Sequence, residues 1–233
     1  MKEKTAVYMA AILIALSIPV LVATLATESV AFSERFYLKQ YETLKLKQAT
    51  GFSPDEFMQF SRTLWDYFRN RIASPQALFT APPNSPQPLY QEHELAHLAD
   101  VQYLFQIGWT GRRLALLSLA GSIGLLLILN KGRSGPTIAA AAAAGSSIGI
   151  ACFLLLMLAI WFDFNRAFTA FHLISFDNML WQLDPATDNL IRLFPEQFFQ
   201  TAAVTIAVRA LGAYFAVLVS SLWFYKNRQP RSS

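Results

Sequence analysis

The sequence predicts an all-α integral membrane protein with four transmembrane helices and a mostly helical extracytoplasmic cap. Of its 233 residues, 54% are hydrophobic, and the mean hydropathy of +0.34 is too high for an ordinary soluble domain. The apolar residues are concentrated in four long runs, and most of the charged residues lie between or beside those runs. Together these observations indicate a polytopic membrane protein.

The expected organisation follows the four runs in chain order. The first run, residues 6–26, exceeds the ~7–15 residues of a signal-peptide core, so we expect an uncleaved span. The predicted segments are transmembrane helix 1 (1–27), an extracytoplasmic cap (28–110), transmembrane helices 2 and 3 with a short cytoplasmic loop (111–162), an extracytoplasmic loop (163–200), and transmembrane helix 4 with a cytoplasmic tail (201–233).

Several local signals predict the structure of the cap. Residues 33–50 are charged and amphipathic, which indicates a helix or helix-turn near the membrane surface. The run Ser53-Pro54-Asp55-Glu56 places Ser at an N-cap, Pro at N1 and Glu at N3, a strong helix start. Residues 73–88 hold five prolines and predict a loop. Residues 91–107 then predict a helix that ends at Gly108.

Charge distribution predicts the orientation. With a cytoplasmic N-terminus, the cytoplasmic segments carry a single acid, Glu3, against a set of basic residues: Lys2, Lys4, Lys131, Arg133, Lys226, Arg228 and Arg231. The positive-inside rule therefore predicts that both termini are cytoplasmic. Both polar regions then face outward on the same side, where the helix around His97 and the loop around His172 can meet.

Other residues limit the function classes. The single cysteine, Cys152, lies inside an apolar run, which excludes a disulfide framework and a cysteine-based metal site. The net charge of +4 comes from basic residues that flank membrane segments rather than line a groove, so no nucleic-acid partner is expected. Arg209, inside the last span, should snorkel outward or pair with Asp163 or Glu28, in a structural role.

Residues 163–199 combine many aromatic side chains with His172 and several acids, between two apolar runs. Such a composition favours an interfacial site. The alternative is an aromatic belt with solvated loop charges. A second chemical signal is His93-Glu94-x-x-His97, whose histidines share one helix face and could bind zinc, with Glu94 as the base.

The histidines also support a mechanism without metal. His97 and Asp100 lie three residues apart on one helix face, so the carboxylate could orient the imidazole. With His172 arriving from the other polar region, two imidazoles could form an acid–base pair. At this point three hypotheses stay open: this enzyme chemistry, a membrane zinc peptidase, and a non-catalytic membrane partner in which each histidine only forms hydrogen bonds at the interface.

Two stretches resemble the bacterial lipoprotein intramolecular transacylase family of integral membrane proteins. They are F-H-x-I-x-F-x-N-x-x-W-x-L-D-P-x-T-D-x-L-I-x-x-F-P-E-x-F-F over residues 171–199 and E-x-E-L-x-H-L-x-D-V over residues 92–101. The resemblance implies four spans, an extracytoplasmic cap and an acyltransferase in the bacterial cytoplasmic membrane. It also implies transfer of the sn-2 acyl chain of a diacylglyceryl-modified lipoprotein to the α-amine of its N-terminal cysteine, giving the lyso form.

The resemblance also implies which residues carry the reaction. His97 and His172 would be catalytic, and the residues expected to support them or position substrate are Asp100, Asp177, Asn178, Trp181 and Asp184. His93 lies outside the family signature, so the zinc-like pattern would be accidental. The expected partners are the lipoprotein substrate and membrane lipid, with no cofactor. The sequence does not indicate which histidine is the base and which is the acid. The stretch Asp184-Pro185-x-Thr187-Asp188 primarily predicts a turn and a helix start.

Overall fold

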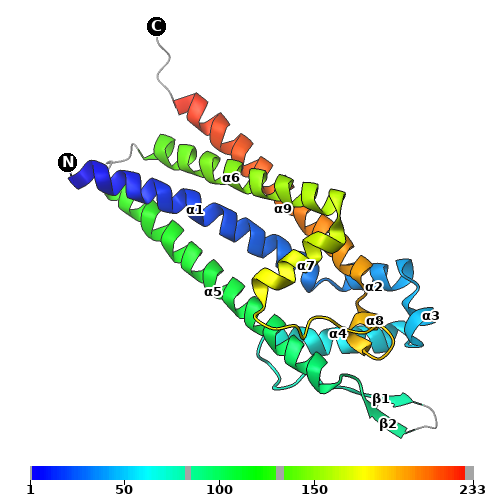
Figure 1. Ribbon diagram of the computed structural model, residues 1–233. Helices are drawn as coiled ribbons and strands as arrows, with labels where there is room; N and C mark the ends of the chain where they lie inside the picture. Colours follow the sequence, from blue (N-terminus) through cyan, green and yellow to red (C-terminus); the bar gives the residue numbers. More distant parts are fainter. Residues whose placement is uncertain (1, 82–84, 130–133, 229–233) are drawn as a thin grey trace. The chain divides into compact units, whose positions relative to one another are not determined.

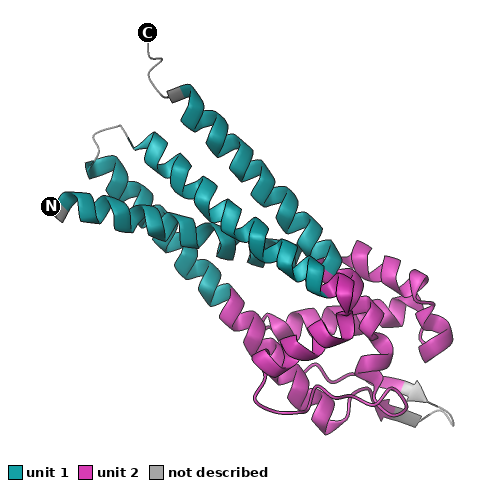
Figure 2. Cartoon of the chain, turned by 45° about the horizontal axis from the view of Figure 1, so that its top comes forward, with its two compact units in different colours: residues 1–29, 109–159, 204–233 teal, residues 30–108, 160–203 magenta. Residues whose placement is uncertain are grey.

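The structure is a computed structural model that describes residues 2–81, 85–129 and 134–228. The chain forms two compact units (Figure 2): unit 1 comprises residues 1–29, 109–159 and 204–233, and unit 2 comprises residues 30–108 and 160–203. The elements, labelled in Figure 1, are α1 (Lys2–Ala31), α2 (Glu34–Thr43), α3 (Leu46–Thr50), α4 (Pro54–Phe68), β1 (Leu78–Ala81), β2 (Ser85–Pro88), α5 (Glu92–Leu129), α6 (Gly135–Phe162), α7 (Phe164–Ser175), α8 (Asn189–Leu193) and α9 (Glu196–Arg228).

Four helices, α1, α5, α6 and α9, are long and apolar enough to cross a membrane. They contain the four predicted apolar runs, so the prediction of four helices of membrane-spanning length and composition is confirmed. Three of the basic residues used to predict the orientation, Lys131, Arg133 and Arg231, lie outside the described residues.

Small residues allow the helices of unit 1 to pack closely. A Cβ atom at Gly145 would collide with the main chain of Ala15 in α1, and one at Gly149 would collide with the ring of Tyr214 in α9. The Tyr214 hydroxyl donates a hydrogen bond to the carbonyl of Pro19 at 2.7 Å. Glycines of α6 thus let a neighbouring backbone and an aromatic ring approach, as small residues do between membrane helices.

Within the described ranges Arg209 does not pair with an acid, contrary to one sequence expectation. Its guanidinium donates to the carbonyl and the hydroxyl of Ser29, at 2.6 and 2.9 Å. Glu28 instead accepts hydrogen bonds from the indole of Trp109 and the guanidinium of Arg112. Trp109 and Arg112 of α5 therefore supply the hydrogen-bond donors to the Glu28 carboxylate. Arg209 donates instead to the carbonyl and hydroxyl oxygens of the next residue, Ser29.

Unit 2 begins with two short helices joined at a left-handed residue. The hydroxyl of Ser33 caps α2 by accepting from the N–H of Phe36, and Lys45, at φ 52°, separates α2 from α3. Helix α4 has the predicted capping box: Glu56 accepts from the main chain of Ser53 at 2.8 Å, while the Ser53 hydroxyl accepts from the Glu56 N–H. The helical structure predicted for residues 33–50 and the helix start predicted at Ser53 are confirmed.

Two predictions were wrong in part. Residues 73–88 are not a loop throughout, because β1 and β2 pair as an antiparallel hairpin with Phe79 opposite Gln87. In β2 the prolines alternate with Ser85 and Gln87. Every second residue therefore keeps a main-chain N–H, which is sufficient for pairing with a single neighbouring strand. Gly108 does not end a helix, since α5 runs continuously from Glu92 to Leu129. A helix-interior glycine costs about 1 kcal/mol, which a long helix absorbs.

Candidate functional site

Helix α7 carries one of the two candidate histidines and was not predicted as a helix. Asp163 caps it by accepting from the N–H of Arg166 at 3.0 Å. The spacing of Phe164, Phe168 and His172 is four residues, so these side chains share one helix face. This spacing, following an N-cap residue, was the available signal in the sequence.

The structure brings His97 of α5 and His172 of α7 together, both within unit 2. Their ring centroids are 6.1 Å apart with an interplanar angle of 33°, and the residues are only 7% and 6% exposed. The sequence predicted that the two polar regions meet at these histidines, and within unit 2 the two imidazoles lie next to each other.

Aromatic rings enclose the two imidazoles. Trp181 lies over His172 with centroids 4.7 Å apart and an interplanar angle of 31°, and Phe168 contacts the same imidazole edge-on at 4.3 Å. Phe176 contacts both histidines, at 5.2 Å from His97 and 5.6 Å from His172. The walls of the site are therefore apolar, and they limit the water that can reach the imidazoles.

One hydrogen bond determines the tautomer of His172. Its Nδ1 lies 2.7 Å from the carbonyl oxygen of Phe168, and a carbonyl only accepts, so Nδ1 carries the proton. In the neutral imidazole Nε2 then holds the lone pair. By contrast, Nδ1 of His97 and Nε1 of Trp181 are buried without a hydrogen-bond partner among the described residues.

Burial keeps both imidazoles neutral. The part of α5 that holds His97 precedes the apolar part of the helix and belongs to unit 2. Burial, reinforced by the neighbouring His172, lowers the pKa of His97 to about 4, although Asp100 opposes this shift. Burial also lowers the pKa of His172, and the hydrogen bond to Phe168 opposes it only in part. At neutral pH the site therefore holds two uncharged imidazoles.

Asp100 is not hydrogen-bonded to His97 in the described part of the chain. Its carboxylate accepts from the side-chain amide of Asn178 at 2.8 Å, and the Asn178 carbonyl accepts from the N–H of Leu180 at 3.0 Å. Asp100 and Asn178 therefore link α5 to the loop that follows α7, between His172 and Trp181 in sequence. The hydrogen bond to Asn178 thus takes the place of the expected contact between Asp100 and the His97 imidazole. The charge of Asp100 still acts on His97, by opposing the lowering of its pKa.

Asp184 lies in the expected turn. Its carboxylate accepts from the N–H of Ala186 at 2.9 Å, and its carbonyl accepts from the N–H groups of Thr187 and Asp188. Asp188 is the N-cap residue of α8. The turn and helix start predicted for this stretch are confirmed, and the hydrogen bonds of Asp184 are local to the turn.

Glu94 and Asp188 form a second polar cluster, which sequence reasoning did not identify. The side chain of Glu94 is fully buried and accepts from the N–H of Gln91 and the N–H of Leu190, both at 2.7 Å. Asp188 accepts from the N–H of Asp184 at 2.8 Å and lies 2.9 Å from Nε2 of His93. The available signal was Glu94 three residues after Gln91, a capping-box spacing.

This second cluster separates the members of the zinc-like pattern. His93 is directed to Asp188, Glu94 to two main-chain N–H groups, and His97 to His172. Among the described residues, no group of three or more His, Cys, Asp or Glu side chains could hold a metal ion. The pattern His93-Glu94-x-x-His97 thus divides between a structural cluster and the histidine pair.

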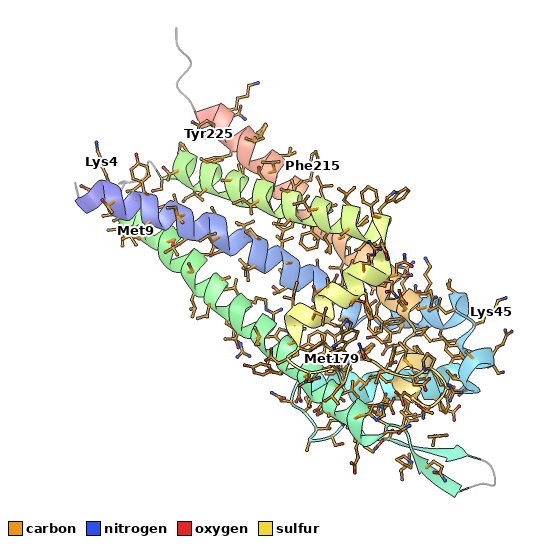
Figure 3. The ribbon with its side chains drawn as sticks, viewed as in Figure 1. Lys4, Met9, Lys45, Met179, Phe215 and Tyr225 are labelled. Carbon is orange, nitrogen blue, oxygen red and sulfur yellow. The ribbon has the colours of Figure 1, made fainter. Side chains whose placement is uncertain are left out.

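A small cavity of about 250 Å³ lies beside the histidine pair. One wall is a stripe of α5, formed by Asp100, Tyr103, Leu104 and Ile107, and the other is formed by Ser175, Phe176, Asp177 and Asn178 at the end of α7. Met179, labelled in Figure 3, is the next residue of that loop. The cavity brings Asp177, a predicted support residue, close to the site, and Phe176 is shared between the cavity and the histidines.

Two comparisons with known proteins point to the same family. A family model described as lipoprotein intramolecular transacylase Lit matches residues 12–199. The solved structure of the membrane integral lipoprotein intramolecular transacylase Lit from Bacillus cereus is similar to this chain, with a TM-score of 0.78, 21% identity, and coverage of 96% of this chain and 97% of that one. No curated protein sequence gave a significant match.

Two further structures of the Bacillus cereus protein are also similar to this chain. In them one histidine is replaced by arginine or by alanine. Both give a TM-score of 0.73 at 20% identity, and cover 96% of this chain. At this level of identity the structures show a shared fold over nearly the whole length.

Proposed function

The chain belongs to the lipoprotein intramolecular transacylase family, and we propose that it transfers the sn-2 acyl chain of a diacylglyceryl-modified lipoprotein to the α-amine of the N-terminal cysteine. The product is the lyso form of the lipoprotein. The observation that carries the proposal is the pair of buried imidazoles with centroids 6.1 Å apart, of which one has a defined tautomer.

The reaction needs only folding of the substrate and movement of one proton. The amine nitrogen attacks the ester carbonyl carbon, an amide bond forms, and the bond from that carbon to the glyceryl oxygen breaks. The transition state closes an eight-membered ring of nitrogen, Cα, Cβ, sulfur, two glyceryl carbons, ester oxygen and carbonyl carbon. Holding the amine and ester in contact is where most of the acceleration should arise.

His172 is assigned as the general base. Because Nδ1 donates to the Phe168 carbonyl, the lone pair of Nε2 is the one available to accept a proton from the amine. The Trp181 ring, tilted by 31° against the imidazole with centroids 4.7 Å apart, restricts the orientation of His172. An α-amine has a pKa of about 7.7–8.0, so a weak base is sufficient to make it nucleophilic.

His97 is assigned as the hydrogen-bond donor and acid. Its low pKa means that it stays neutral, and a neutral imidazole can donate N–H to the developing oxyanion or to the leaving glyceryl oxygen. The proton accepted by His172 returns to the glyceryl oxygen through this pair, so the enzyme ends each turnover in its starting state.

The aromatic walls favour aminolysis over hydrolysis. The rings of Phe168, Phe176 and Trp181 cover the imidazoles, which reduces the access of water that would otherwise release a free fatty acid. Also on α7, Phe171, whose ring contacts His172, and Ile174 are exposed, at 48% and 87%. These side chains are suited to contact the acyl chains of the substrate and of membrane lipid.

The proposed location of the reaction is the outer face of the bacterial cytoplasmic membrane. The support is the distribution of charge: the segments predicted to be cytoplasmic are basic, and the two polar regions that carry the histidines lie across a span from them. Both termini would then be cytoplasmic, and four helices would cross the membrane.

The test is product analysis in cells that make diacylglyceryl lipoprotein and lack any competing N-acylation. The full chain, His97→Ala, His172→Ala and the control His93→Ala are expressed, and tandem mass spectrometry locates the acyl group on the N-terminal peptide. We expect the N-acyl, S-monoacylglyceryl product from the native chain and from His93→Ala. Each of the other two variants should lose about 10²–10⁴-fold of the activity.

Two outcomes contradict the proposal. An unchanged diacylglyceryl peptide beside well-expressed native protein would exclude the transacylation. Full product from His97→Ala or His172→Ala would exclude the paired-histidine mechanism while leaving the reaction itself established. A peptidase that uses zinc at His93, Glu94 and His97 predicts instead that His93→Ala is inactive and that the purified protein contains zinc.

A further inference from the structure

We propose that the cavity between α5 and the end of α7 binds the peptide residue that follows the lipidated cysteine, and that Asp177 gives it a preference for a cationic side chain. The proposal rests on the proposed function, because it names where the remainder of the lipoprotein lies during the reaction. It assigns a specificity role to residues that do not carry the proton transfer.

The cavity lies where the peptide must continue. Phe176 lines it and contacts both imidazoles, while Asp100, also in its wall, follows His97 by three residues, about one helical turn. When the α-amine of the cysteine lies at His172, the next Cα is only ~3.8 Å along the chain. The residue after the cysteine therefore has to occupy space adjacent to the histidine pair.

The size of the cavity fits one residue rather than an ion. Its volume of about 250 Å³ far exceeds the ~30 Å³ that a water molecule occupies in the liquid, and it falls short of the ~300–1,000 Å³ of sites that enclose a whole small ligand. The cavity is thus suited to a side chain with part of its main chain, at one end of a longer substrate.

The lining determines which side chain fits best. Tyr103, Leu104 and Ile107 form an apolar wall, along which the methylene groups of a lysine can pack. The lining includes two carboxylates, those of Asp100 and Asp177. No basic side chain is among the described residues that line the cavity. Asp100 is already hydrogen-bonded to Asn178, so Asp177, which is exposed, is the carboxylate best able to meet an incoming cation.

The experiment uses the purified full chain and three synthetic diacylglyceryl lipopeptides that differ only in the residue after the cysteine: Lys, Ser or Glu. Competition between pairs, read by mass spectrometry, gives ratios of kcat/KM. For the native chain we expect Lys over Glu by about tenfold, since an interaction of ~1.4 kcal/mol is a factor of ten. Asp177→Asn should reduce that ratio by about three- to fivefold, and Asp177→Lys should invert it.

Asp66→Asn is the matched control, because Asp66 is a partly exposed acid of the same unit that pairs with Arg71. It should leave the Lys-to-Glu ratio unchanged. The Ser peptide reports whether each variant is folded and active. Equal rates for the three peptides, or a ratio unaltered in Asp177→Asn, would overturn the inference. Absence of transacylation on every peptide would instead contradict the proposed function.

Discussion

Unit 2 contains two buried polar clusters that differ in how completely they are hydrogen-bonded. We call them the carboxylate cluster (Glu94, Asp188 and their partners) and the histidine cluster (His97, His172 and Trp181). In the carboxylate cluster both oxygens of Glu94 accept main-chain N–H groups, and Asp188 accepts from the N–H of Asp184 and contacts His93. In the histidine cluster, polar atoms of His97 and Trp181 are buried without a partner among the described residues.

The difference is consistent with a structural role for the carboxylate cluster and with the catalytic role proposed for the histidine cluster. Buried polar groups are normally hydrogen-bonded, because an unpaired group loses its interaction with water and gains nothing. The carboxylate cluster follows this rule and joins α5 to α8. The histidine cluster departs from it, and such departures are expected where a substrate is to supply the missing partner. Variants in the two clusters should therefore affect different measurements.

Apart from the two histidines themselves, the largest expected effect is on the rate, from loss of the Trp181 ring. Trp181→Ala removes the surface that orients His172, and misplacement of a catalytic group by ~1 Å can cost about 100-fold. Trp181→Phe keeps an aromatic face and should lose less than about fivefold. The measurement is kcat on a diacylglyceryl lipopeptide. Equal losses in the two variants would show that the ring face is not what positions the base.

A smaller effect, on stability, is expected from Glu94→Gln. The amide retains one acceptor oxygen and turns an N–H₂ toward a main-chain donor, so about 1–3 kcal/mol of stability should be lost. For a chain of this size the thermal midpoint would fall by roughly 2–12 °C. The rate per folded molecule should be retained. A folded variant without activity would contradict the assignment of Glu94 to structure and favour a catalytic carboxylate.

The pH dependence distinguishes the clusters further. Burial lowers the pKa of His97 and of His172 below the ordinary value near 6.5. Between about pH 6.5 and 4 the unfolded chain therefore binds protons that the folded chain excludes. Stability is fully present above about pH 6.5 and falls as the pH falls through this window, by up to ~1.4 kcal/mol per pH unit for each excluded proton. His97→Ala should show a shallower slope.

Histidine NMR gives a direct check, since the chain has only three histidines. The signals are assigned by the alanine variants. That of His97 should remain that of a neutral imidazole below pH 6, and His172 should titrate below the ordinary pKa near 6.5. Protonation of both near pH 6.5 would contradict the proposed neutral pair.

The smallest effect is expected from His93→Gln. The side chain of His93 is 39% exposed, and that of Asp188 only 3%. Burial alone would raise the pKa of Asp188, but hydrogen bonds from His93, Asp184 and Thr187 outweigh it and lower the pKa. Losing one of several donors should cost about 0.5–1.5 kcal/mol, measured as a shift in thermal midpoint. Activity at neutral pH should not change, and a marked loss would place His93 in the reaction.

Features set by local sequence were predicted best. The four apolar helices follow from run length, the start of α4 follows from the Ser53 capping box, and the turn at Asp184 follows from its Asp-Pro sequence. In each case the deciding interactions join residues a few positions apart, so the pattern along the chain contains the information.

Features set by long-range contacts were missed. The acceptor role of Glu94 depends on Leu190, 96 residues later, and the link between Asp100 and Asn178 spans 78 residues. Helix signals were also overridden: Gly108 ends no helix, and the proline-rich residues before α5 include a hairpin. Propensity is a weak preference of about 1 kcal/mol per residue, which neighbouring structure can exceed.

The hydrogen bond from His172 to the carbonyl of Phe168 has a consequence for how the site can change over evolution. Many catalytic histidines depend on a carboxylate side chain to select their tautomer, and one substitution removes it. Here the acceptor belongs to the main chain, four residues earlier in the same helix, and every amino acid provides that carbonyl. Position 168 can therefore change to other apolar side chains, and under the proposed function accommodate other acyl chains, while the lone pair of His172 stays on the same nitrogen.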